Sequence, residues 1–302
     1  MTAHFTVEND VAETIIEDFK QHLETQGLSP ATIASYVTDV TQFHDYLDHM
    51  GERRQVPPTR FHVTRFRSYL LEQRFQPATI NKKINSLAAY DRFLNEHGIL
   101  QGPIIHPRRD RIRIAAGSQR EVDTFTDDEV TRILFHVQQR TCPTRNRLVV
   151  ELLLYTGVRV SELCNIQLTD MDLLTRTLKV TGKGGTYREI PLRSEVVESI
   201  QHYMREERKE SRFAESPYLL VSERAPRLHR DAVNNVLRKI GRALKINIYP
   251  HKFRHTFCTN LLRKGVPLTT VAKLAGHASI QTTSQFYIQT SRKDMEEAIT
   301  LL

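Results

Sequence analysis

The chain has 302 residues, enough for about two domains of roughly 150 residues each, and its 39% hydrophobic and 26% charged residues are an ordinary globular composition. The longest largely apolar stretch, residues 148–155, is far shorter than the roughly 20 residues of a membrane span, and residues 1–10 show no secretory signal, so we expect a cytoplasmic protein. Three widely spaced cysteines without a CxxC pair support neither a disulfide framework nor a zinc site, and a net charge of +8 suits a polyanionic partner.

The first hundred residues predict four amphipathic helices. In the first helix an apolar residue recurs at every fourth position until Gly27, a stop signal. The second begins with Ser29 as N-cap and Pro30 at the first helical position. A third apolar stretch covers residues 63–70, and a fourth helix opens at Pro77. This pattern indicates a small all-helical domain, which we place at residues 1–107.

The second and fourth helices start with the same four letters, PATI, at residues 30–33 and 77–80. Two copies are too few for a solenoid. The similarity indicates either helix-start chemistry that recurs by chance or a duplicated helical hairpin.

Residues 108–120 interrupt the helical pattern and are predicted to be a basic linker. Positive charge begins near this segment, since residues 1–59 carry a net charge of −7, residues 60–120 of +8 and residues 121–302 of +7. Such a linker is either simply solvated or follows a phosphate backbone. Its arginines are Arg108, Arg109, Arg111 and Arg113.

The second domain, residues 121–302, is predicted to be mostly helical with a small sheet. Thr126 and Glu129 form a capping box ahead of a helix, and residues 148–155 make an apolar helix. Residues 177–192 alternate in polarity on either side of a glycine-rich turn, which is typical of a β-hairpin. Helices return after about residue 194, so the fold class is mainly α with a small β-sheet.

Several familiar sites are excluded by their motifs. The hairpin turn Gly182-Lys183-Gly184-Gly185 does not satisfy the P-loop pattern, and no HExxH, GxSxG or GxGxxG is present. Nucleotide-driven and metalloprotease chemistry therefore lose support.

Two segments contain arginines that are candidates for binding a phosphate. Arg159 follows a glycine that ends the apolar helix, and Glu162 is positioned to orient it; the alternative is a helix C-cap with a surface ion pair. His251 and Arg254 share one helix face, where a guanidinium grips two phosphate oxygens and an imidazole shuttles a proton. For this second motif alone, an ordinary DNA-facing or solvent-facing helix is the favoured interpretation.

A third segment contains Leu274-Ala275-Gly276-His277, with Tyr287 ten residues further on. Taken alone, His277 is typical of a capping or core histidine, and Tyr287 of a half-buried aromatic residue.

Taken together, five segments in this order closely resemble the tyrosine recombinase (phage integrase) family. They are TGVRVSEL, the GKGG hairpin, HKFRH, LAGH and the tyrosine, spread over about 130 residues. The resemblance implies an N-terminal helical core-binding (SAM-like) domain and a C-terminal α+β catalytic domain. Two small departures are Phe253, where leucine is common, and Gln289, where histidine is frequent.

The resemblance assigns the site residues one by one. It implies six catalytic residues: Arg159, Lys183, His251, Arg254, His277 and Tyr287. Glu162 is the supporting acid, and His255 matches a frequent family residue of less defined role. Candidate DNA contacts are Lys82 and Lys83 together with the four linker arginines.

The implied activity is site-specific DNA recombination through a 3′-phosphotyrosyl intermediate, without ATP or metal. The implied partners are a double-stranded DNA site and other copies of the chain in a cyclic homotetramer at the nucleoid, with accessory proteins left open. Residues 291–302 are predicted to form a short apolar-faced helix, which docks either on its own domain or on a neighbouring subunit. Because the helical module stands first in the sequence, we expect a simple Xer-type or mobile-element recombinase and not one of the larger phage integrases with a separate arm-site-binding domain.

Two rival functions remain open. A type IB topoisomerase-like enzyme uses a similar constellation but relaxes supercoils alone, so strand exchange and tetramer formation separate it from a recombinase. A recombinase relative that binds DNA without cutting is disfavoured because all six catalytic positions are intact.

Overall fold

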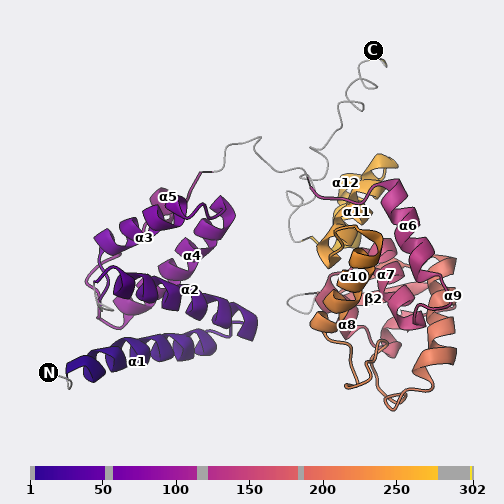
Figure 1. The fold of residues 1–302 in the computed structure, drawn as a ribbon, viewed down its shortest axis with the longest axis horizontal. Coiled ribbons are helices and arrows are strands. Elements are labelled where there is room, and N and C mark those ends of the chain that lie inside the picture. The colour runs from indigo at the N-terminus through magenta and orange to yellow at the C-terminus, as the bar shows by residue number, and fades with distance from the viewer. Residues whose placement is uncertain (1–3, 52–56, 114–121, 183–186, 278–299, 301–302) are drawn as a thin grey trace. The chain divides into compact units, whose positions relative to one another are not determined.

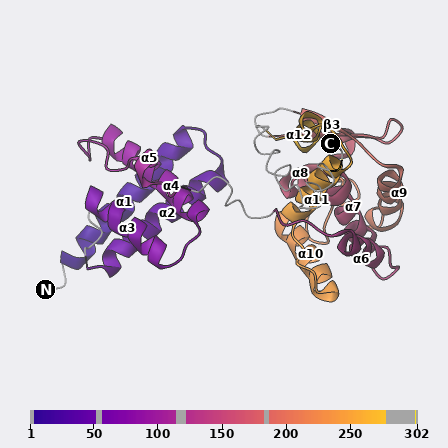
Figure 2. The same ribbon diagram turned by 90° about the horizontal axis from the view of Figure 1, so that it is seen from above.

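The computed structural model describes residues 4–51, 57–113, 122–182, 187–277 and 300, with side chains from residue 12 onward. The chain divides into two compact units, residues 1–119 and 120–302, and we describe each by itself (Figures 1 and 2). No helix among the described residues is both long and apolar enough to cross a membrane.

Helices are the only regular secondary structure among the described residues of the first unit, and the four expected amphipathic helices are confirmed. Ser29 caps the second of them, since its hydroxyl accepts a hydrogen bond from the Thr32 backbone N–H at 3.3 Å. The helices are α1 (His4–Thr25), α2 (Pro30–His49), α3 (Arg60–Glu72), α4 (Pro77–Glu96) and the short α5 (Pro107–Asp110).

Aromatic and aliphatic side chains from α1–α4 form the core of the first unit. Phe19 of α1 meets the ring of Tyr90 of α4 edge-on at 5.2 Å between centroids, and Phe43 of α2 meets Phe66 of α3 in the same way. The core also contains a charge: Asp39 of α2 is 2% exposed. Its carboxylate is held by groups on α4, which ties the two helices together.

The predicted start of the linker is wrong. Residues 107–110 form α5, and Asn81 of α4 binds both backbone polar groups of Ile112, at 2.7 Å and 3.0 Å. The Asp110 carboxylate also accepts a bidentate hydrogen bond from Arg60. These are tertiary contacts that no local sequence pattern reveals, and they make residues 108–113 part of the first unit.

The second unit combines helices with one small sheet. Its elements are α6 (Asp127–Val137), α7 (Thr144–Thr156), α8 (Val160–Asn165), the 3₁₀ turn η1 (Leu168–Asp170), β1 (Met171–Asp172), β2 (Thr177–Thr181), β3 (Tyr187–Pro191), α9 (Ser194–Tyr203), the π-helical turn η3 (Met204–Arg208), α10 (Arg230–Leu244), α11 (Pro250–Arg263) and α12 (Leu268–Ala275).

Helix α7 is the buried centre of this unit, in contact with α6, α9 and α11 (Figure 2). The capping box before α6 is confirmed: the Thr126 hydroxyl accepts from the Glu129 N–H at 3.1 Å, and the Glu129 carboxylate accepts from the Thr126 N–H at 3.0 Å.

The predicted hairpin is confirmed in its strands, β2 and β3, and a short strand β1 that the sequence did not indicate extends the sheet in the order β1-β2-β3. Leu178 pairs with Ile190 and Val180 with Arg188, so Arg188 lies on the same face of the sheet as these buried apolar residues. The tip of the hairpin, residues 183–186, lies outside the described residues.

Candidate active site

The end of α7 places the first arginine. Gly157 ends the helix in the left-handed conformation with φ of +62°, and a Cβ at this position would lie 2.4 Å from Phe257 Cδ1. Two features therefore require glycine here: the left-handed backbone conformation and the close approach of α11. The chain then restarts as α8 with Arg159 at its N-cap.

Glu162 fixes Arg159 in place, as the sequence predicts. Its Oε1 accepts from Arg159 Nη1 and its Oε2 from the Arg159 backbone N–H, both at 2.8 Å. The Glu162 side chain is 7% exposed, whereas that of Arg159 is 37% exposed. Burial by itself would raise the pKa of Glu162, but hydrogen bonds from Arg188 and Arg159 outweigh it and hold the pKa below its usual value. Glu162 is therefore a carboxylate that orients a solvent-reaching guanidinium.

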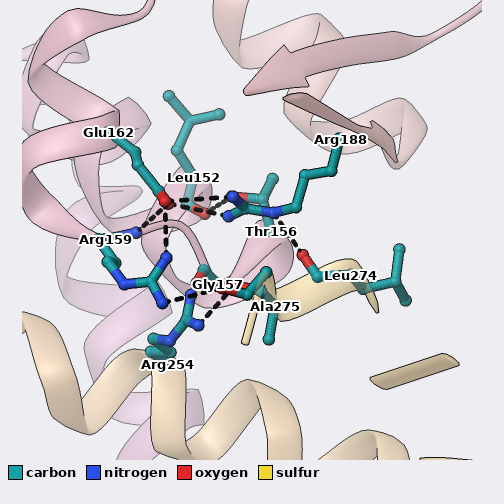
Figure 3. Close-up of polar contacts among 10 residues, drawn as sticks. Leu152, Thr156, Gly157, Arg159, Glu162, Arg188, Arg254, Leu274 and Ala275 are labelled. Atoms are coloured by element: carbon teal, nitrogen blue, oxygen red, sulfur yellow. Dashed lines mark hydrogen bonds and ion pairs between the residues drawn. The ribbon is translucent and has the colours of Figure 1, made fainter. Parts of the chain in front are cut away.

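The second arginine, Arg254, comes from α11 and is only 3% exposed. Its Nη1 donates to the Gly157 carbonyl at 2.6 Å and its Nη2 to the Ala275 carbonyl at 2.5 Å. Burial lowers its pKa to about 10, which leaves it fully charged at neutral pH. Because two amino groups are held at once, this guanidinium has one orientation (Figure 3).

Three arginines converge on the C-terminal end of α12. The carbonyl oxygens of Leu274, Ala275 and Gly276, which we call the α12 carbonyls, each accept from a different one. The donors are Arg188 Nε at 2.8 Å, Arg254 Nη2 at 2.5 Å and Arg159 Nη2 at 2.9 Å, respectively. The last carbonyls of a helix lack intrahelical partners and carry partial negative charge, so they suit guanidinium donors. His277 follows directly.

Sequence reasoning missed Arg188. It lies on β3, its side chain is 9% exposed, and its guanidinium binds both oxygens of Glu162, at 3.1 Å and 2.8 Å (Figure 3). One signal was present in the sequence: Arg188 is two residues before Ile190, so it occupies the apolar face of the predicted strand.

The histidines lie beside this positive charge. His277 is half-buried, and burial together with Arg254, Arg159 and Arg188 lowers its pKa to about 4. His251 lies on α11 one turn before Arg254 and is more exposed; burial, then the charges of Arg254 and Arg159, lower its pKa. Both imidazoles are therefore neutral at neutral pH.

A cavity of about 1070 Å³ opens beside these groups. Its lining includes Arg159, Arg188 and His277. It also includes Gly182, which follows β2, and Tyr187, which begins β3. The Lys183 position is the residue after Gly182, and it lies outside the described residues, as do Tyr287 and residues 291–299. Four of the expected site residues, Arg159, Glu162, Arg254 and His277, are thus joined by contacts or lie next to each other along the chain.

The candidate DNA contacts of the first unit differ in exposure. The arginines at 108, 109, 111 and 113 are exposed, although Arg111 also binds Asn85 at 2.6 Å. Lys82 is exposed and pairs with Asp39 at 3.0 Å. Lys83 is only 5% exposed and is bound to Asp39 and Gln42, so its burial corrects the expectation that it faces DNA.

No group of three or more His, Cys, Asp or Glu side chains within the described ranges is arranged to hold a metal ion.

Comparison with known proteins gives matches over both units. Residues 123–294 match the family described as "Phage integrase family", and residues 16–98 match "Phage integrase, N-terminal SAM-like domain". Tyrosine recombinase XerC of Oceanobacillus iheyensis is 30% identical over 295 residues, covering 95% of this chain and 94% of its own. Tyrosine recombinase XerA of Pyrococcus furiosus is 30% identical over 298 residues, covering 97% of this chain and 95% of its own. The TnP I resolvase of Bacillus thuringiensis is 31% identical over 271 residues, covering 89% and 93%.

Solved structures share the fold. The Tn1549 transposon integrase in complex with transposon right end DNA has a TM-score of 0.70 at 17% identity, covering 95% of this chain and 98% of its own. The XerH site-specific recombinase bound to its difH substrate has a TM-score of 0.68 at 20% identity, covering 88% and 78%.

Proposed function

The chain belongs to the phage integrase family and is a tyrosine site-specific recombinase, and from this premise we propose that it cuts and rejoins duplex DNA through a 3′-phosphotyrosyl bond to Tyr287. The observation that supports the proposal most is the shared anchoring of Arg159 and Arg254. These guanidiniums come from different helices, yet both bind the α12 carbonyls immediately before His277.

Two fixed guanidiniums suit the charge of a phosphodiester under attack. Negative charge grows on the non-bridging oxygens, and positively charged donors that are already in place stabilise it without reorganisation. Neutral His277 adds a hydrogen bond to the same phosphate. Removal of one such donor typically costs about a hundredfold or more in rate.

The proton transfers are assigned to two further groups. The phenol of Tyr287 attacks phosphorus and gives its proton to His251, whose lowered pKa keeps it neutral and able to accept. The bond from phosphorus to the 5′-oxygen breaks, and Lys183, assigned by the family resemblance, protonates the leaving 5′-oxygen. The 5′-hydroxyl of a partner strand then reverses these steps. The phosphotyrosyl bond retains the energy of the phosphodiester, so the reaction requires neither ATP nor a metal.

We further propose that four subunits act on two DNA sites. Exchange of strands between two duplexes requires four cuts, and each subunit provides one tyrosine. Residues 291–302 place Met295, Ala298, Ile299 and Leu302 at helical spacing, which favours a docking segment passed around a closed ring.

A nicked suicide substrate carrying the native site tests the proposal. The wild-type chain should form an SDS-resistant adduct with the 3′ end, and Tyr287→Phe should bind the DNA without forming it. Tyr187→Phe is the matched control, because Tyr187 lines the cavity and is 71% exposed. An adduct that survives Tyr287→Phe would contradict the assignment, and if Tyr187→Phe then lost this adduct, the nucleophile would be Tyr187.

The same assay separates the rival functions. Joining of the cleaved strand to a partner duplex by a DNA-bound tetramer supports a recombinase. Cleavage and religation by a monomer, with no transfer to a partner, would indicate a topoisomerase-like enzyme, and binding without any adduct would indicate a non-cutting relative.

A further inference from the structure

We propose that Arg188 is a positioning residue of this active site, which sets Arg159 through Glu162 and holds the end of α12 that leads into His277. This inference deepens the proposed function and rests on it. Arg188 belongs to none of the segments by which the chain resembles its family.

The guanidinium of Arg188, on β3, contacts both α8 and α12. Its two amino groups bind the two oxygens of Glu162 as a fork, and its Nε donates to the Leu274 carbonyl at 2.8 Å. Because the guanidinium is planar, these three contacts fix α8, α12 and β3 relative to each other. Lysine lacks this shape and cannot make all three contacts.

Glu162 transmits the position of Arg188 to Arg159. The oxygen that accepts from Arg159 Nη1 also accepts from Arg188 Nη1, and the oxygen that accepts from the Arg159 N–H also accepts from Arg188 Nη2. The carboxylate is therefore held on both sides. Without Arg188, the carboxylate would keep only its contacts with the Arg159 backbone N–H and side chain, and it would lose its contact with β3.

Charge supports the same role. Two arginines share one buried carboxylate, so Arg188, Glu162 and Arg159 together keep a net charge of +1 beside the cavity. In the absence of Arg188, Glu162 would neutralise Arg159 instead. The attraction between Arg159 and a phosphate would then fall even if its position were unchanged.

The close fit at Gly276 agrees with a positioning role. A Cβ at this residue would lie 2.7 Å from Arg188 Nη1, and its φ is +66°. The end of α12 therefore follows the surface of the Arg188 guanidinium closely. A salt bridge that only added stability would not require such contact at the residue before His277.

The test measures single-turnover cleavage of the suicide substrate by the full chain. Arg188→Met should slow cleavage by about tenfold to a hundredfold, as for outer partners that orient a group in contact with substrate. DNA affinity should change much less. Arg188→Lys should recover part of the rate because it restores charge without the fork. Arg193→Met is the control, since Arg193 follows the same strand and pairs with Glu195, with both side chains 54% exposed.

A double-mutant cycle tests whether Arg188 acts on cleavage through Arg159. If Arg188 acts through Arg159, adding Arg188→Met to Arg159→Ala should slow cleavage by no more than about threefold further. Should Arg188→Met fail to fold, the cycle is run with Arg188→Lys. Cleavage by Arg188→Met at the wild-type rate would overturn the inference, and a full and independent loss in the Arg159→Ala background would overturn the route through Glu162 and Arg159. Absence of a wild-type adduct at Tyr287 would instead overturn the proposed function.

Discussion

At the residue scale, burial and the nearby arginines together lower the pKa of two histidines in the site. The pKa of His277 lies at about 4 and that of His251 below its ordinary 6.5, first because both are partly buried and then because Arg254 and Arg159 repel a second positive charge. A histidine that stays neutral accepts a proton from a phenol, and one that is already protonated does not.

This predicts an acidic limit for cleavage. Single-turnover cleavage should hold steady from neutral pH down to about 6.5 and fall below it, as protonation of His251 removes the base. The rate is measured as a function of pH with DNA binding checked at each point. A fall centred above pH 6.5, or a falling limb that persists unchanged in His251→Gln, would contradict the assignment of His251 as base.

A second residue-scale prediction concerns Gly276. Gly276→Ala adds a Cβ against Arg188 at a left-handed φ of +66°, so it should strongly reduce cleavage. Gly265→Ala is the matched control, because Gly265 has φ of +76° and nothing within 4 Å of an added Cβ. Both variants share the backbone strain, so the difference between their cleavage rates reports the effect of crowding the contact with Arg188, next to the Gly276 carbonyl that binds Arg159. Equal rates would show that this contact has no role in the reaction.

At the element scale, local pattern predicts most of the fold. The helices of the first unit, the capping box at Thr126 and the strands of the hairpin follow from apolar spacing, caps and alternation within a few residues. The role of Arg188 was missed because its partner Glu162 lies 26 residues away in the chain. The start of the linker was misplaced because Ile112 is held by Asn81, 31 residues before it.

The site shows the same division. Glu162 lies three residues from Arg159, so the sequence alone predicts that pair. The α12 carbonyls, in contrast, are joined to Arg159 across 117 residues and to Arg254 across 21. Backbone acceptors have no side-chain signature, so the convergence of three arginines on them emerges only from the folded chain.

Neighbouring lysines on α4 give an element-scale prediction. Consecutive side chains of a helix point about 100° apart, so Lys83 is buried while its neighbour Lys82 is exposed. Lys83→Met leaves Asp39 without its buried partner and should destabilise α2 and α4 by about 3 kcal/mol, whereas Lys82→Met should cost less than about 1 kcal/mol. Hydrogen–deuterium exchange of these helices in the full chain measures both. Equal protection in the two variants would contradict this division of roles.

At the scale of the whole molecule, positive charge is concentrated after residue 59, where the chain carries a net +15 against −7 before it. A protein that binds DNA mainly through phosphates releases counterions, so its affinity falls steeply as salt increases. The exposed pair Arg108 and Arg109 on α5 belongs to this charge.

We therefore predict a linear fall of log affinity with log salt concentration. Arg108→Gln and Arg109→Gln should each reduce the slope by about 1 and weaken binding to all DNA sequences alike. Arg212→Gln, in the segment between η3 and α10, serves as the control of equal charge change. If the slope is the same in the α5 variants and the wild type, α5 makes no phosphate contact.

The account as a whole depends on a covalent bond between Tyr287 and DNA, and peptide mapping of the trapped adduct tests it directly. Trypsin should release residues 274–292 as one peptide, in which Tyr287 is the sole tyrosine. The account predicts that mass spectrometry finds the 3′-linked nucleotide on this peptide, at Tyr287. A nucleotide on the peptide of residues 184–188, which contains Tyr187, or on any residue other than Tyr287, would contradict it.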